Sequence, residues 1–266
     1  KDMAKRTRVS ASSNSTKKAA ASGRRVSKKT KINKTEITES IQKNTFLDYN
    51  IQQKYNLTTV HENFLDVCFK DTCKLSLIDG PAGSAKTYLS VYIALQLLRT
   101  HKIEEIVYIR SVVESASKSM GSLPGEVEDK FLPWSLPLLE KLNELLDKPT
   151  INNLMSESFI KCVPVNYTRG LTFKNACVLI DESQNLTKEE LTTILTRFGH
   201  DSKYIVIGDS QQSDIGNKSG FDVIFKAFNT KESLEHGMNV FKFTELEIVR
   251  SEILKYIVKV LQKIKS

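Results

Sequence analysis

The chain has 266 residues, a formal net charge of +8 and a hydrophobic fraction of 40%, which is enough for a sizeable core. No apolar run approaches the roughly 18 residues that cross a bilayer, and the N-terminal residues lack the apolar segment of a secretory signal. These features argue against a membrane-spanning protein and predict a cytoplasmic one with no membrane partner. The four cysteines show no metal-ligand spacing, so we expect reduced, mostly buried thiols.

The positive charge is concentrated in one segment. Residues 1–34 contain twelve Lys or Arg and one acid, a net +11, whereas the remainder contains 27 basic and 30 acidic residues, a net −3. A segment so poor in large apolar residues cannot offset its ordering entropy, and we expect a disordered basic tail. This tail could contact nucleic-acid phosphates, resemble an acid-poor targeting sequence, or only solubilise the chain. Residues 35–266 are predicted to form a single domain.

The predicted elements alternate between apolar strands and helices. Strands are expected over residues 74–79, 105–110, 159–165, 176–181, 204–208 and 240–243. Helices are expected over residues 58–69, 86–100, 133–146, 188–198 (capped by Thr187), 221–228 and 247–264. Such alternation predicts an α/β fold, with a parallel sheet that carries helices on both faces. Ligands of these sheets bind beyond the carboxyl ends of the strands.

A small-residue turn joins the first predicted strand to the helix that follows. Freed backbone N–H groups and the helix dipole at such a turn favour an anion, so the sequence predicts a phosphate-binding loop. Lys86 is expected to reach the β- and γ-phosphates, and the Thr87 hydroxyl to bind a magnesium ion. The loop consists of Gly80, Pro81, Ala82, Gly83, Ser84, Ala85, Lys86 and Thr87.

Ala85 stands where the Gly-x-x-x-x-Gly-Lys-Thr pattern has its second glycine. Alanine fits without strain if this position is already helical. If the position has a positive φ, alanine costs roughly 1 kcal/mol and crowds the ligand. A strand-to-helix turn that binds nothing is the alternative for the loop taken alone.

Two further strands end in polar motifs. The fourth strand ends in Asp181 and Glu182, which are expected to hold magnesium and to activate the attacking water, respectively. Taken alone, these acids could simply begin a turn. The fifth strand ends in Gly208-Asp209, and the amide of Gln211 is expected to hydrogen-bond the γ-phosphate or the attacking water.

The order of these motifs resembles the ATPase motifs of superfamily 1 helicases. Residues 57–264 are similar to the PhoH-like family, the phosphate-starvation-inducible ATPases related to that helicase core. Besides the phosphate loop and motifs 181–184 and 208–212, the matching segments are residues 110–114, 121–130, 167–172, 195–199 and 247–250. The resemblance implies a RecA-like P-loop NTPase core, ATP and Mg²⁺, and RNA or single-stranded DNA as polymer. It also implies a homo-oligomer, with a hexameric ring as the expected form.

The resemblance also implies a catalytic arginine near the γ-phosphate, supplied by a neighbouring subunit of the ring. Arg250, expected at the start of the last helix, is the first candidate, although it could instead sense nucleotide within its own subunit. Arg197 and Arg169 are the next candidates, and a structural ion pair is the alternative for each. Ser111 replaces a proline that is usual in the family, and only residues 61–63 lie near the place of its adenine-reading glutamine.

These observations predict a magnesium-dependent ATPase that couples hydrolysis to nucleic-acid handling as a helicase-like motor. A nucleotide-gated switch or scaffold, which turns over little because of Ala85, is one alternative. The other is a structural ring whose basic tail does the work.

Overall fold

The computed structural model describes the backbone of residues 47–111 and 127–265, all of which belong to one contact-defined unit, residues 41–266. The predicted disordered tail and the turn cluster near residue 120 therefore lie outside the described residues. Within the described part, no helix combines the length and apolarity needed to cross a membrane.

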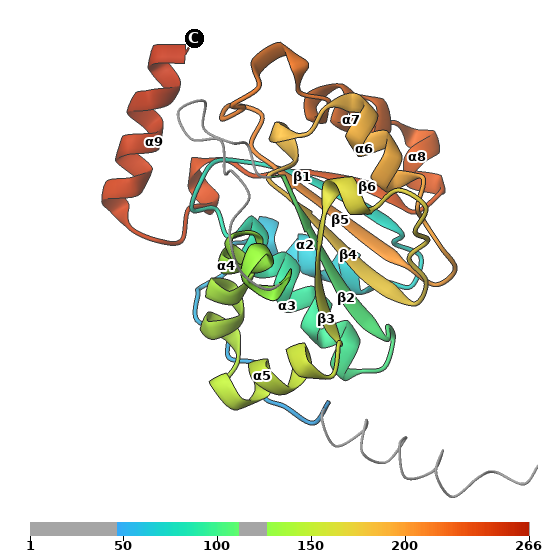
Figure 1. Ribbon diagram of the computed structural model, residues 1–266. Coiled ribbons are helices and arrows are strands. Elements are labelled where there is room, and N and C mark those ends of the chain that lie inside the picture. The colour runs from blue at the N-terminus through green and yellow to red at the C-terminus, as the bar shows by residue number, and fades with distance from the viewer. Residues whose placement is uncertain (1–46, 112–126, 266) are drawn as a thin grey trace, which may run out of the picture. The chain divides into compact units, whose positions relative to one another are not determined.

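A six-stranded sheet with the order β3-β2-β4-β5-β1-β6 forms the centre of the structure, and every neighbouring pair is parallel (Figure 1). The strands are β1 (Leu75–Asp79), β2 (Glu105–Arg110), β3 (Ile160–Pro164), β4 (Ala176–Asp181), β5 (Lys203–Gly208) and β6 (Met238–Lys242). The helices are α2 (Thr59–Phe69), α3 (Lys86–Arg99), α4 (Val127–Leu145), α5 (Lys148–Ser156), α6 (Lys188–Leu195), α7 (Phe221–Phe228), α8 (Lys231–Glu235) and α9 (Glu252–Lys265). The predicted α/β class is confirmed.

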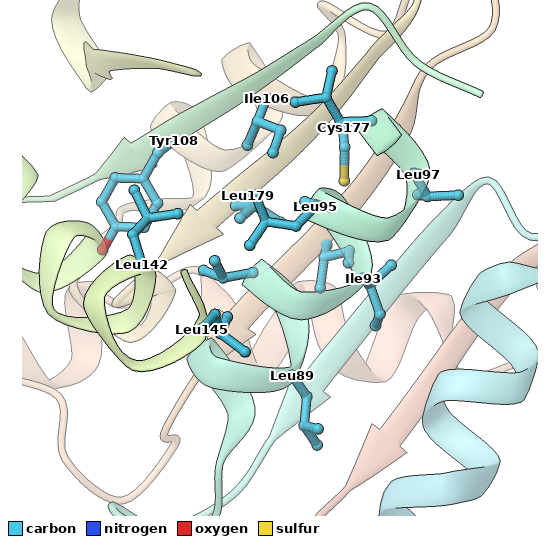
Figure 2. Packing of buried hydrophobic residues seen from close by; sticks show 14 of the residues in the cluster. Leu89, Ile93, Leu95, Leu97, Ile106, Tyr108, Leu142, Leu145, Cys177 and Leu179 are labelled. Atoms are coloured by element: carbon cyan, nitrogen blue, oxygen red, sulfur yellow. The ribbon is translucent and has the colours of Figure 1, made fainter. Parts of the chain in front are cut away.

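Both faces of the sheet are covered because its strands are apolar on both sides. One face packs against α2, α3, α4 and α5, and the other against α6 and α7 (Figure 1). Figure 2 shows the first face, where leucines and Ile93 of α3 meet Cys177 and Leu179 of β4 and Ile106 of β2. Leu142 and Leu145 of α4 extend the same cluster. Two layers of helices thus fix the sheet, and with it the ends of its strands.

The strand register brings the polar motifs to one edge of the sheet. Asp79, the last residue of β1, is paired with Gly208 of β5, and Asp181 of β4 is paired with Arg110 of β2. Because β5 lies between β1 and β4, the phosphate loop and the two acids of β4 approach each other across the end of β5. All of these residues lie at the carboxyl ends of parallel strands, where ligands of such sheets bind.

Two helices begin at places other than those predicted. The helix α4 begins at Val127 rather than at residue 133 and continues through Pro133 and Pro137. These prolines are four residues apart, so their missing N–H donors affect one side of the helix. The helix α9 begins at Glu252, five residues later than expected, because Glu247 instead accepts hydrogen bonds from the N–H and hydroxyl of Thr244 and caps a separate short turn.

A buried lysine connects β5 to the end of α2. The Lys203 ammonium donates to the carbonyl oxygens of Cys68 and Lys70, the latter at 2.9 Å, and the residue is 8% exposed. Carbonyls at a helix C-terminus lack intrahelical donors, and a cation there also matches the helix dipole. Lys203 therefore helps to hold α2 against the sheet.

We predict that Lys203→Met lowers the free energy of unfolding by about 1–3 kcal/mol, because methionine keeps the aliphatic stem but removes the ammonium from the buried Cys68 carbonyl and from the Lys70 carbonyl, which keeps the bond from the Cys73 N–H. Urea denaturation measures this change. Lys226→Met on exposed α7 is the control, and we expect it to change stability by about 0.5 kcal/mol or less. Equal effects of the two substitutions would contradict the role of Lys203.

Candidate functional site

The phosphate loop leaves β1 and enters α3 through two residues with positive φ. Gly83 has a φ of 82°, and Ala85, the residue before the first turn of α3, has a φ of 61° and a ψ of 14°. The hydroxyl of Ser84 donates to the Pro81 carbonyl at 2.7 Å and tightens the turn. Ala85 therefore does not have the helical conformation that alanine adopts without strain. It has the positive φ that costs an alanine roughly 1 kcal/mol.

The Lys86 ammonium is held against the beginning of the loop. It donates to the carbonyl oxygens of Gly80 at 2.6 Å and Pro81 at 2.8 Å. Burial lowers the pKa of Lys86, and the nearby carboxylates, Asp209 and Asp181 foremost, oppose that shift. A cation surrounded by carboxylates at the end of the sheet is suited to an anionic ligand bound together with a metal ion.

Thr87 and Asp181 meet across the end of β5. The Thr87 hydroxyl donates to Asp181 Oδ1 at 3.2 Å, and the Tyr108 hydroxyl donates to Asp181 Oδ2 at 2.7 Å. Burial and the Asp181 charge raise the pKa of Tyr108 well above its usual value, so Tyr108 remains a donor. The sequence reasoning missed Tyr108, which faces Asp181 from the adjacent strand β2.

This pair of oxygen groups fits a magnesium ion. Mg²⁺ prefers hard oxygen ligands and is commonly held by one or two carboxylates, with phosphate and water oxygens completing its shell. Within the described part of the chain, no cluster of three or more His, Cys, Asp or Glu side chains is placed to hold a metal. A metal here would therefore use Thr87 and Asp181 as its protein ligands and depend on a phosphate for the rest.

Glu182 follows Asp181 in a left-handed backbone conformation, with a φ of 51°. Its Oε1 lies 3.4 Å from the Arg110 guanidinium, and its Oε2 accepts from the Gln184 amide at 2.6 Å. The side chain is 38% exposed, so it lies at the boundary between the site and solvent. Two donors thus orient a carboxylate directly beside the proposed metal ligand.

Gln184, to which the sequence assigned no role of its own, connects the ends of β4 and β5. Besides donating to Glu182, its side-chain oxygen accepts from the Asp209 N–H at 3.0 Å. The residue is buried, with 3% exposed. Asp79 makes a similar connection, because its carboxylate accepts from the N–H and hydroxyl of Ser210, both at 2.9 Å. The loop after β5 is therefore fixed to β4 on one side and to β1 on the other.

A cavity of about 370 Å³ lies at this edge of the sheet. Residues 82–87 of the phosphate loop line it together with Asp181, Glu182 and Arg250. Gly80 and Pro81 line a neighbouring hollow instead. The cavity thus contains Lys86, the acids at the end of β4, and three further cations: Arg110, Lys141 and Arg250.

Gln211 and Gln212, which are adjacent in the motif after β5, line two different hollows. Gln212 lines the cavity, whereas Gln211, the residue expected to contact phosphate, lines the neighbouring hollow with Gly80 and Pro81. The expectation for Gln211 therefore does not match its position. The spacing could have indicated this, because the helicase pattern Gly-Asp-x-x-Gln places its glutamine at residue 212.

Arg250 precedes α9 by two residues rather than beginning the helix, and it lines the cavity of its own chain. The segment is attached to the phosphate loop, because the Val249 N–H donates to the Gly83 carbonyl at 3.1 Å. The Arg250 guanidinium is 54% exposed and lies 4.0 Å from Glu140. Arg197 donates to the Thr193 carbonyl at 3.2 Å, and Arg169 is exposed. This position favours the own-subunit alternative for Arg250.

His61 is buried beneath the phosphate loop. The Thr58 N–H donates to its Nδ1 at 3.2 Å, so Nε2 carries the proton and donates to the Ser84 carbonyl at 3.2 Å. Burial lowers the pKa of His61 below its usual value. Both ring nitrogens therefore serve the structure of the loop.

We predict that Ala85→Gly raises the free energy of unfolding by about 0.5–1 kcal/mol, because glycine adopts a positive φ without strain. Thermal unfolding measures the change. Ala227→Gly in α7 is the matched control and should lower stability by about 1 kcal/mol, because that alanine lies in an ordinary helix. A lower free energy of unfolding in Ala85→Gly would contradict the interpretation that the backbone at Ala85 is strained.

We also predict that acid destabilises the fold partly through His61. The pKa of His61 is lower in the folded state than in the unfolded chain, so the unfolded chain binds the proton first as the pH falls. The free energy of unfolding should therefore be unaffected by His61 above about pH 6.5 and should decrease below it. Urea denaturation at pH 7.5 and 5.5 should show a smaller decrease for His61→Gln than for the unchanged chain. Equal decreases in the free energy of unfolding of both proteins would show that His61 does not contribute to the destabilisation by acid.

A comparison with known proteins agrees with this arrangement. A family model described as "PhoH-like protein" matches residues 53–262. The PhoH-like protein of Synechocystis is 31% identical over 88% of this chain and 66% of its own length, and that of Bacillus subtilis is 36% identical over 69% and 57%. The chain thus spans between half and two thirds of these relatives.

Among solved structures, the Sulfolobus solfataricus SWI2/SNF2 ATPase core in complex with dsDNA aligns with 74% of this chain and 46% of its own, with a TM-score of 0.43 and 14% identity. That likeness is too low to indicate a function. The family match covers most of the chain, including the phosphate loop and the acids of β4. The chain therefore belongs to the PhoH-like family.

Proposed function

We propose that the chain is a magnesium-dependent ATPase that couples hydrolysis to the handling of RNA or single-stranded DNA. The observation that carries the proposal is that Lys86, Thr87, Asp181 and Glu182 line one cavity, although they follow or end two strands, β1 and β4, that are not neighbours in the sheet. A triphosphate and its metal need these groups on one side of one pocket.

Each side chain has a distinct role in this proposal. Lys86 and the loop amides bind the phosphates, and Thr87 and Asp181 hold the magnesium ion, which supplies charge neutralisation when bound. Glu182 takes the proton of the attacking water, and its bonds from Arg110 and Gln184 keep the carboxylate oriented. Arg250 adds a cation to the cavity from within the same chain, 4.0 Å from Glu140 of α4.

Gln212 replaces Gln211 as the proposed phosphate or water contact. We predict that Gln212→Ala slows single-turnover ATP hydrolysis by about 10²-fold, because one positioned hydrogen-bonding group is lost from the cavity. Gln211→Ala is the matched control, one residue away and in the neighbouring hollow, and we expect a much smaller effect. The assignment would be reversed if the Gln211 variant were the slower one.

A nucleotide-gated switch with little turnover is a second candidate. It is favoured by the positive φ of Ala85 and by the two donors that already engage Glu182. Single-turnover hydrolysis separates the two functions. The ATPase proposal requires Glu182→Gln to be slower than the unchanged chain by roughly 10²–10⁴-fold, and it fails if the two rates are equal. Ala85→Gly then reports whether the strained loop limits the rate.

The polymer and the oligomer are proposals of the same kind. The +11 charge of residues 1–34 supports contact with a nucleic acid, and such contact weakens with salt. Stimulation of ATP hydrolysis by single-stranded RNA and DNA across salt concentrations tests this partner and distinguishes the two polymers. The family resemblance implies a hexameric ring of subunits. Because Arg250 already lines the cavity of its own chain, the ring is not needed to supply this arginine. We propose instead that the ring serves assembly on the polymer.

A further inference from the structure

One end of the cavity is formed by side chains other than those proposed to bind phosphate or magnesium, with Arg250 nearby, 4.0 Å from Glu140 of α4. It is lined by Tyr55, from the segment before α2, by Tyr88 of α3, and by Lys141 and Glu144 of α4. Tyr88 directly follows Thr87 in the sequence, so one residue step separates this end from the proposed metal site. A ligand whose phosphates bind at residues 82–87 lies in the same cavity as these side chains.

The two tyrosines form a rigid aromatic corner. Their ring centroids are 4.8 Å apart and the rings are nearly perpendicular, at 80°. Tyr88 is buried, and its hydroxyl accepts from the Lys54 N–H at 3.0 Å and donates to the Gln52 carbonyl at 3.3 Å. These bonds fix the segment that carries Tyr55. Because the pair is edge-to-face, each ring meets its partner on one side only, and Tyr55 remains partly exposed beside the cavity.

A polar network surrounds this corner. The Tyr55 hydroxyl donates to Glu144 Oε2 at 2.9 Å, and the Lys141 ammonium donates to Glu144 Oε1 at 2.5 Å. Burial opposes the ionisation of Glu144, but the hydrogen bonds from Lys141 and Tyr55 outweigh it and lower its pKa. A carboxylate has about four lone-pair sites, so Glu144 retains the capacity to accept from a ligand. The corner therefore combines an aromatic surface with a fixed acceptor.

The residue nearest the family's adenine-reading position is committed elsewhere. His61 is fully buried, does not line the cavity, and uses both ring nitrogens within the protein. His61 is therefore not available to a ligand in the cavity, whereas Tyr55 and Glu144 line it.

We propose that this end of the cavity is a base subsite, in which the Tyr55 ring stacks on the base of a bound nucleotide and Glu144 accepts a hydrogen bond from its exocyclic amino group. This inference rests on the proposed function, because it requires the phosphates to bind at residues 82–87. It assigns the ligand class as a nucleotide with an amino-bearing base, such as adenine. It also explains why α4, far from the loop in sequence, lines the cavity.

The experiment compares three probes by calorimetry with Mg²⁺ present: ATP, inosine triphosphate, which has a carbonyl oxygen in place of the amino group, and inorganic tripolyphosphate, which has no base. The unchanged chain should bind ATP roughly 10-fold more tightly than inosine triphosphate, because only ATP donates to Glu144. Tyr55→Ala should weaken ATP binding by about 5- to 100-fold and change tripolyphosphate binding by less than about twofold.

Tyr256→Ala is the matched control, because Tyr256 lies on α9, is exposed and does not line the cavity. It should leave the binding of all three probes unchanged. Tyr55→Phe keeps the ring and removes only the bond to Glu144, so its ATP affinity should lie between those of the unchanged chain and Tyr55→Ala.

If Tyr55→Ala does not fold, the affinities of the unchanged chain for the three probes still test the base subsite. Equal affinities of the unchanged chain for ATP, inosine triphosphate and tripolyphosphate would overturn the base subsite while leaving the phosphate site intact. If none of the three probes binds to the unchanged chain, the proposed function fails, and the base subsite fails with it.

Discussion

The hydrogen bond between Thr87 and Asp181 depends on the register of the sheet, and much of the site depends on the same register. These residues are 94 positions apart in sequence: Thr87 lies in α3, after the loop that leaves β1, and Asp181 ends β4, with β5 between the two strands. Parallel pairing aligns the carboxyl ends of all three strands, so a loop from one strand and an acid from another can meet beyond the third. The two helical layers keep this alignment, because β1, β4 and β5 are buried on both faces.

Strain and hydrogen bonding are concentrated at this edge. Ala85 and Glu182 both have positive φ, one in the phosphate loop and one directly after the acid of β4. Such conformations cost of order 1 kcal/mol or more and persist only where the surroundings enforce them. Around Ala85 the loop carbonyls accept hydrogen bonds from Ser84, Lys86 and His61, and the Glu182 side chain accepts from Gln184. The loops at the site are thereby held by side chains as well as by the sheet.

The cavity has two chemically different ends that share one helix. At one end, Lys86 and Thr87 begin α3 and face carboxylates, whereas at the other Tyr88 supports an aromatic corner closed by α4. A nucleotide is a ligand with the same division, because its phosphates are anionic and its base is flat and apolar on both faces. This match between the two halves connects the proposed reaction with the proposed base subsite.

The sequence by itself determined the α/β class, the bounds of β2 and β4, and the place of the phosphate loop, because an apolar run or a glycine-rich turn is a local signal. It also contained the cap for α5, Asp147 followed by Pro149, which was overlooked. Only the tertiary structure decided the φ of Ala85. It alone placed Arg250 in its own chain's cavity and brought Tyr55 to Glu144, 89 positions away. Loop direction and long-range packing fix these features, and neither leaves a periodic trace in the sequence.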